Sequence, residues 1–164
     1  CIKKNKAMIS ATHLHAMIVH FPIALLMAGF LSEVIALSTK KEFFRNAAVY
    51  LLFLGAMGSV AAYFSGDFAG EGIEEGPLEG PMELHEQAAT VTLWLSIITA
   101  LFRVGVYYFK STAIWTQVAG ILLYSALIGS VAYTGYLGGQ LVYRHGAGIE
   151  LALPDFNTSA EEAD

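Results

Sequence analysis

Five histidines are the residues of this chain whose type and placement could do chemistry. His13, His15 and His20 lie at the start of the first long apolar segment, His85 precedes the third, and His145 follows the fourth. Imidazole is the commonest metal-binding side chain and is rare inside bilayers. An even number of membrane crossings separates these positions, so all five histidines are expected on one side of a membrane. Several imidazoles at one depth predict a ligand site.

A haem iron held by two histidines needs imidazoles from two helices at a similar depth. His20 and His85 meet this requirement and are the first predicted ligand pair for a b-type haem. His15 and His145 are predicted as a second pair or as supporting residues, so one or two haems are expected. On a helix, His15 and His20 point about 140° apart and differ by roughly 7.5 Å in height. They are therefore not expected to bind the same iron.

A non-haem metal site is the alternative chemistry. Asp67 ends the second apolar segment on the side of the histidines, where it could join His20, His85 or His145 around zinc or iron. A cofactor-free structural or assembly subunit, which binds neighbouring helices through small-residue faces, is a further alternative. No catalytic residues are predicted, because the G-x-S-x-G, H-E-x-x-H and P-loop patterns do not occur.

Composition indicates which elements position these residues. The 164 residues are 55% hydrophobic and 14% charged, with a mean hydropathy of +0.56. A soluble domain carries about 25% charged residues, so these values predict a membrane protein. The net charge of −5 argues against nucleic-acid binding. Four membrane-spanning helices are expected near residues 15–37, 47–64, 88–109 and 114–137, each close to the ~20 residues that cross a bilayer. The predicted fold is an all-α, four-helix integral membrane bundle.

The connections predict an orientation. The first and third connections, 38–46 and 110–113, are short and basic, whereas the second, 65–86, is longer and acidic. Basic residues favour cytoplasmic loops, which places both termini and the acidic connection on the outer, periplasmic side. Lys3, Lys4 and Lys6 run against this bias. The expected organisation is an N-terminal segment 1–12, a membrane domain 13–150 and an acidic tail 151–164, in a bacterial inner membrane.

The first residue, Cys1, has two explanations. It is either the acylated N-terminal cysteine of a lipoprotein or the end of a fragment. It is also the single cysteine of the sequence, so an internal disulfide is excluded.

Two charged residues fall within the predicted spans. Glu33 is expected to pair with Lys40, Lys41 or Arg103, or to face water. Arg103 is expected to extend its guanidinium to the cytoplasmic surface. Neither residue is expected to form a proton relay with the histidines, because most of a bilayer separates them.

Four sequence features together resemble one family. They are HAMIVHFPIALL in the first span, Gly66-Asp67-Phe68, His85, and GGQLVYRHGAGI after the fourth span. This set is similar to the DUF2231 family, which comprises predicted four-helix bacterial membrane proteins, and it covers roughly residues 13–150. The family pattern H-P-x-x-V-H-F-P is matched at His15, Val19, His20, Phe21 and Pro22, with Ala16 in place of the usual proline.

The resemblance implies a part of a membrane redox system, because some relatives are fused to c-type cytochrome domains. His85 and His145 fall where relatives also tend to have histidine. No C-x-x-C-H occurs here, so covalent haem is not expected in this chain. The expected function is a b-type haem protein that relays electrons near the outer surface. Its expected partners are membrane lipid and a c-type cytochrome, a quinone or other redox subunits.

Overall fold

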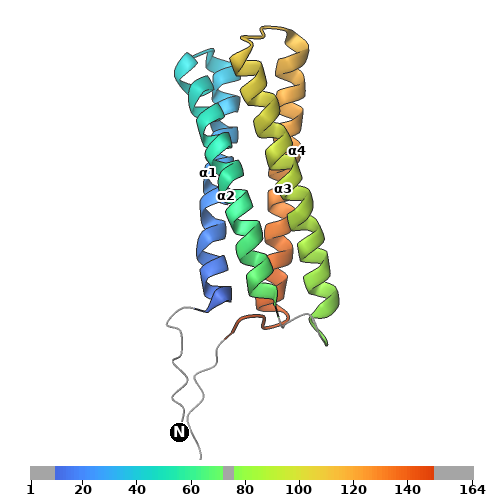
Figure 1. Cartoon of the computed structure of the whole chain (residues 1–164). Helices are drawn as coiled ribbons and strands as arrows, with labels where there is room; N and C mark the ends of the chain where they lie inside the picture. Colours follow the sequence, from blue (N-terminus) through green and yellow to red (C-terminus); the bar gives the residue numbers. More distant parts are fainter. Residues whose placement is uncertain (1–9, 72–75, 150–164) are drawn as a thin grey trace, which may run out of the picture.

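The chain forms four long helices that run alternately up and down the molecule (Figure 1). The computed structural model describes residues 10–71 and 76–149. Within them the helices are α1 (Ala11–Thr39), α2 (Glu42–Gly70), α3 (Glu79–Tyr108) and α4 (Ile114–Tyr143). The described residues contain no strand. The predicted all-α, four-helix architecture is therefore confirmed.

Each helix is long enough and apolar enough to cross a membrane. With 29 or 30 residues, the helices are about 43–45 Å long, which exceeds the ~30 Å of hydrocarbon in a bilayer. The chain is thus a multi-pass membrane protein whose helices extend into the headgroup regions. The expected tail 151–164, residue Cys1 and most of the segment 1–12 lie outside the described residues.

The connection between α2 and α3 is shorter than its glycines and prolines predict. Helix α2 continues through Gly66 and Asp67 to Gly70, and α3 already begins at Glu79. Pro81 lies in the first turn of α3, where the N–H that proline lacks would have no helical partner. Residues 65–70 and 79–86 thus extend α2 and α3 beyond the expected spans, and the two helices are interrupted between Gly70 and Glu79.

The helix ends have local causes. The Ser10 side chain accepts a hydrogen bond from the backbone N–H of His13, which caps the start of α1. Lys40 adopts a left-handed conformation with φ 56°, and its N–H donates to the carbonyl of Ala36, which ends α1. Lys41 follows as the first flanking residue of α2, so the chain reverses within two residues.

The core lies along the axis of the bundle, between the α1–α2 hairpin and the α3–α4 hairpin. Glycines allow the closest approaches. A Cβ at Gly55 would lie 2.7 Å from Cδ2 of Leu26, and a Cβ at Gly29 would overlap the hydroxyl of Tyr124. That hydroxyl donates to the carbonyl of Leu26 at 3.1 Å, which ties α4 to α1. The buried cluster comprises Leu26, Leu52, Ala56, Ala100, Tyr124, Leu127 and Val131.

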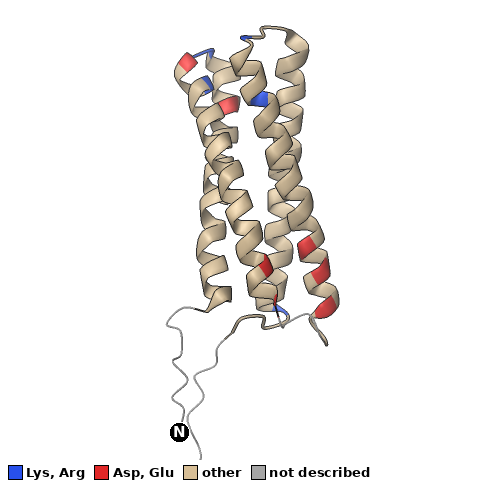
Figure 2. Ribbon diagram, viewed as in Figure 1, with Lys and Arg blue, Asp and Glu red and all other residues tan. Residues whose placement is uncertain are grey.

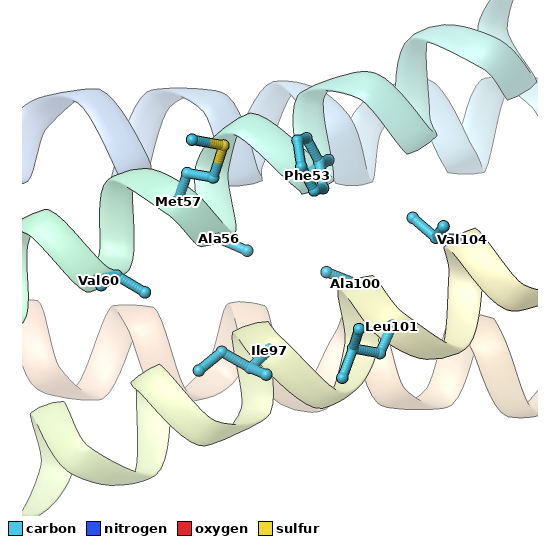
Figure 3. Close-up of a pocket in the computed structure, with 8 residues that line it drawn as sticks. All are labelled: Phe53, Ala56, Met57, Val60, Ile97, Ala100, Leu101 and Val104. Carbon is cyan, nitrogen blue, oxygen red and sulfur yellow. The ribbon is translucent and has the colours of Figure 1, made fainter.

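The outer faces of the helices are apolar. Large exposed hydrophobic side chains occur on all four helices, as expected of a surface that faces acyl chains. A shallow groove between α2 and α3 is part of this surface (Figure 3). Its lining has no polar side chain and consists of Phe53, Ala56, Met57, Val60, Ile97, Ala100, Leu101 and Val104.

Charged residues gather at the two ends of the bundle (Figure 2). The end with the two short connections carries Lys40, Lys41, Arg45 and Lys110. The opposite end carries Asp67, Glu79, Glu83 and Glu86, together with Arg144. The histidines occupy this second, largely acidic end.

Glu33 and Arg103 form a buried ion pair near the basic end of the bundle. Arg103 donates to both carboxylate oxygens of Glu33 at 2.5 Å, and the two side chains are 7% and 4% exposed. Glu33 therefore takes Arg103 as its partner. The expectation that Arg103 reaches the cytoplasmic surface is wrong, because its guanidinium turns inward to neutralise a buried carboxylate.

Candidate functional site

The structure brings two of the five histidines together inside the bundle. His15 on α1 and His85 on α3 are half-buried, and their imidazoles interact electrostatically. The two helices lie diagonally opposite each other, so the rings face the bundle interior from opposite sides. This two-histidine site, His15 and His85, is at the acidic end of the molecule.

A hydrogen-bond network fixes the proton on the His15 ring. Nδ1 of His15 lies 2.9 Å from Oγ of Ser65 on α2, and the Ser65 hydroxyl donates at 2.8 Å to the carbonyl of Ala62. Because the serine proton is used on that carbonyl, the serine oxygen accepts from His15, and Nδ1 carries the hydrogen. Nε2 of the neutral ring then holds a lone pair, the form in which imidazole binds metals.

The His85 ring has one nitrogen without a partner. The ring contacts the backbone carbonyl of Thr134 on α4, whereas the buried Nδ1 atom makes no hydrogen bond. A buried polar atom without a partner is costly, and such an atom calls for a ligand or a water molecule.

Glycines on the following helices let both rings lie against the backbone. A Cβ at Gly66 would lie 3.0 Å from Cε1 of His15, and a Cβ at Gly138 would lie 3.1 Å from Cε1 of His85. These distances are tighter than nearly all real Cβ contacts. Each imidazole therefore occupies space that a side chain on α2 or α4 would need.

The two histidines occupy equivalent positions in two helical hairpins. His15 of the α1–α2 hairpin lies on Gly66 and meets the carbonyl of Ala62, four residues earlier in α2. His85 of the α3–α4 hairpin lies on Gly138 and meets the carbonyl of Thr134, again four residues earlier. Each glycine thus contacts the histidine of the preceding helix in the same way.

The equivalence extends along α1 and α3 to the other end of the bundle. Glu33 follows His15 by 18 positions, and Arg103 follows His85 by 18 positions. The second hairpin therefore resembles the first at these positions, with α3 running in the same direction as α1 and α4 in the same direction as α2.

The other predicted ligands lie outside this interior site. His20 is exposed, and its Nδ1 contacts the carbonyl of Ala16 in its own helix. His145 is exposed in the turn after α4, His13 is exposed near the start of α1, and Asp67 is exposed on α2. No contact in the described ranges joins His20 to His85 or His15 to His145, so those pairings stay predictions. Within the described ranges, no three His, Cys, Asp or Glu side chains gather as metal ligands.

A row of hydroxyl residues on α3 is a feature that sequence reasoning missed. Thr92, Ser96 and Thr99 follow His85 at intervals of seven, four and three residues, and Arg103 follows four residues later. Such intervals place all five side chains on one face of the helix. Ser96 and Thr99 are fully buried, so this face lies in the bundle interior. The spacing of these polar residues could have predicted the row, because a helix face that packs in an apolar core or contacts lipid would carry apolar residues at the same positions.

Comparison with known proteins supports the membrane assignment and leaves the chemistry open. A family model described as "Predicted membrane protein (DUF2231)" matches residues 11–151. No curated protein and no solved structure matches the chain.

Proposed function

The chain belongs to the DUF2231 family of predicted membrane proteins, and from that premise we propose that it binds a b-type haem between His15 and His85 and relays electrons. The observation that carries this proposal is the pair of half-buried imidazoles on opposite helices at one level of the bundle. Bis-histidine haems in four-helix bundles are held by side chains of this kind on facing helices.

The residues present would hold a haem iron through two imidazoles. His15 offers a lone pair at Nε2, because Ser65 holds the hydrogen of Nδ1 in place. The buried Nδ1 of His85 has no partner, and it offers a lone pair in the tautomer that carries its hydrogen on Nε2. Gly66 and Gly138 allow each ring to lie back against the neighbouring helix. A haem bound there would supply reversible one-electron transfer at its iron.

The same proposal concerns the position of the site in the membrane. Basic residues at the end with the short connections favour a cytoplasmic location for that end, so the two-histidine site is at the outer, periplasmic surface of a bacterial inner membrane. A single site near one surface does not carry electrons across the bilayer alone. The protein would pass electrons to a c-type cytochrome, a quinone or another redox subunit at that surface.

The first experiment is an optical spectrum of the protein purified in detergent from its native membrane, before and after reduction with dithionite, with haem quantified per chain. We expect a reducible b-type spectrum and one haem per chain. A second haem would direct attention to His20 and His145 as a further pair. Native protein without a Soret band would overturn the proposal, and metal analysis of the same sample would then show whether another ion occupies the site.

A further inference from the structure

We propose that hydroxyl side chains of α3 and α4, together with internal water, form a proton path from the two-histidine site to the Glu33–Arg103 pair. The inference stands on the interior polar row and does not require haem. It assigns a transmembrane activity to the bundle.

The polar row has the length of a membrane crossing. The five residues from His85 to Arg103 on one face of α3 span 18 positions, which corresponds to about 27 Å along the helix. The hydrocarbon core of a bilayer is ~30 Å thick. The row therefore links the outer end of the bundle to the inner end through the region in which water is otherwise excluded.

Hydroxyls of α4 complete the outer half of this path. Oγ1 of Thr92 lies 2.8 Å from Oγ1 of Thr134 and 2.6 Å from Oγ of Ser130. Thr134 is also the residue whose carbonyl meets the His85 ring. The hydroxyls of Thr92, Ser130 and Thr134 thus form one hydrogen-bonded group across the α3–α4 interface, and the His85 ring lies against the backbone of Thr134.

The inner half has the spacing and the unused hydrogen-bonding capacity that water needs. Ser96 and Thr99 are both 0% exposed, and the Ser96 hydroxyl donates to the carbonyl of Leu93 at 2.8 Å, which leaves its oxygen as an acceptor. Successive residues from Thr92 through Ser96 and Thr99 to Arg103 are separated by about 4.5–6 Å along the helix, a gap that one water molecule bridges. Oγ1 of Thr99 has no hydrogen-bond partner. Buried water is found where such polar atoms would otherwise stay unsatisfied.

Thr99 differs from hydroxyl residues that only pack in a helix. Ser59, Thr90 and Ser32 each donate to the carbonyl four residues earlier, which satisfies the hydroxyl within its own helix. Thr99 makes no such bond within the described residues. Its hydroxyl is therefore free to bond to a molecule in the bundle interior.

Proton transfer along this row needs no other reactant. Each hydroxyl or water accepts a proton on an oxygen lone pair and releases its own proton to the next oxygen, so O–H bonds form and break in equal number. At the inner end Glu33 is the proton acceptor, because Arg103 keeps its proton at all accessible pH values. Glu33 is 3% exposed, so in this proposal internal water takes the proton from its carboxyl group and passes it to the inner solution. At the outer end the lone pairs of His15 and His85 accept protons.

The experiment reconstitutes the full chain in phosphatidylcholine vesicles that contain a trapped pH-sensitive dye. Valinomycin and a potassium gradient drive proton entry, with potassium leaving to balance charge. We expect faster acidification than in protein-free vesicles. Thr99→Val should reduce the protein-dependent rate by about fivefold, the factor expected when one hydrogen bond is lost from the slowest transfer.

The matched control is Thr90→Val, which makes the same change on the same helix, two residues away from the row. Its rate should equal that of the wild type. Because valine has the shape of threonine and the Thr99 hydroxyl has no protein partner, Thr99→Val should fold; Ser96→Ala is the second variant if it does not. Wild-type vesicles no faster than protein-free vesicles would overturn the proposal. Wild-type rates in both Thr99→Val and Ser96→Ala would also overturn it and leave the hydroxyls a packing role.

Discussion

Arg103 on α3 donates to both carboxylate oxygens of Glu33 on α1, across the full width of the bundle interior. These diagonally opposite helices are otherwise separated by α2 and α4, against which both of them pack. The ion pair therefore sets the depth of α1 relative to α3, and with it the common depth of His15 and His85.

Breaking this pair should be strongly destabilising. Arg103→Met leaves the Glu33 carboxylate buried without a partner, which typically costs about 3–5 kcal/mol of unfolding free energy. Denaturant titration of the protein in mixed micelles measures this loss. The double variant Glu33→Leu with Arg103→Met should recover most of it, because it buries no charge. A single variant as stable as the wild type would show that the carboxylate reaches water.

The position of the His85 ring should depend on Gly138 and not on the adjacent Gly139. Gly138→Ala places a Cβ 3.1 Å from Cε1 and 3.5 Å from Nδ1 of His85, so the ring must move. Gly139→Ala meets no atom within 4 Å and should stabilise the helix by up to about 1 kcal/mol. Side-chain NMR signals of labelled histidine should shift only in Gly138→Ala. Equal spectra for the two variants would contradict the close contact.

Gly29 and Tyr124 should show coupled effects on stability. Gly29→Ala places a Cβ on the Tyr124 hydroxyl and forces the ring off the Leu26 carbonyl, so it should destabilise the protein. Tyr124→Phe alone should cost about 1 kcal/mol, the net value of one hydrogen bond. With phenylalanine at 124, Gly29→Ala should be less costly, because the clashing oxygen is gone. Thermal unfolding of all four proteins gives the coupling energy; additive effects would refute it.

The two-histidine site predicts a ranking of histidine variants in haem binding. His15→Ala and His85→Ala should each remove most of the haem from purified protein, because each removes one axial ligand. His20→Ala should retain haem, since His20 is exposed and bonds to its own helix. Haem per chain, measured from the reduced spectrum, tests this order. Loss of haem in His20→Ala with retention in His15→Ala would restore the His20–His85 pairing.

Orientation can be tested with single cysteines in a Cys1→Ser background. Ala147→Cys lies after α4 at the histidine end, and Ser111→Cys lies in the short connection at the other end. A membrane-impermeant maleimide should label position 147 in intact cells and position 111 only after permeabilisation. The reverse pattern would place the two-histidine site in the cytoplasm.

Hydropathy was sufficient to predict the four helices and the common end of the histidines. It did not predict which imidazoles face each other, because that depends on rotation of each helix about its axis. In α1 the buried residues Pro22, Leu26, Gly29 and Glu33 define the inner face. His15 lies seven residues before Pro22 and shares that face, whereas His20 is turned about 200° from Pro22. The spacing of the histidines from Pro22 shows which of them faces inward, but only after the inner face of α1 is known.

The pairing of Arg103 with Glu33 was among the alternatives that the sequence left open, whereas the inward path of the guanidinium was missed. An arginine near the end of a span commonly extends toward headgroups. Here a carboxylate on the diagonal helix, together with the space above Gly120, keeps it inside: a Cβ at Gly120 would lie 2.8 Å from an Nη atom of Arg103. A contact between residues 70 positions apart depends on tertiary structure.

The two hairpins differ in charge at one end of the bundle, and this difference determines which hairpins can pack together. At the histidine end the two histidines and the two glycines are identical, but at the other end the equivalent residues carry opposite charges, Glu33 and Arg103. Two copies of the α1–α2 hairpin would place two carboxylates together, and two copies of α3–α4 would place two guanidinium groups together. Only an α1–α2 hairpin packed on an α3–α4 hairpin gives a neutral interior. Because one chain contains both hairpins, each molecule always brings this pair together.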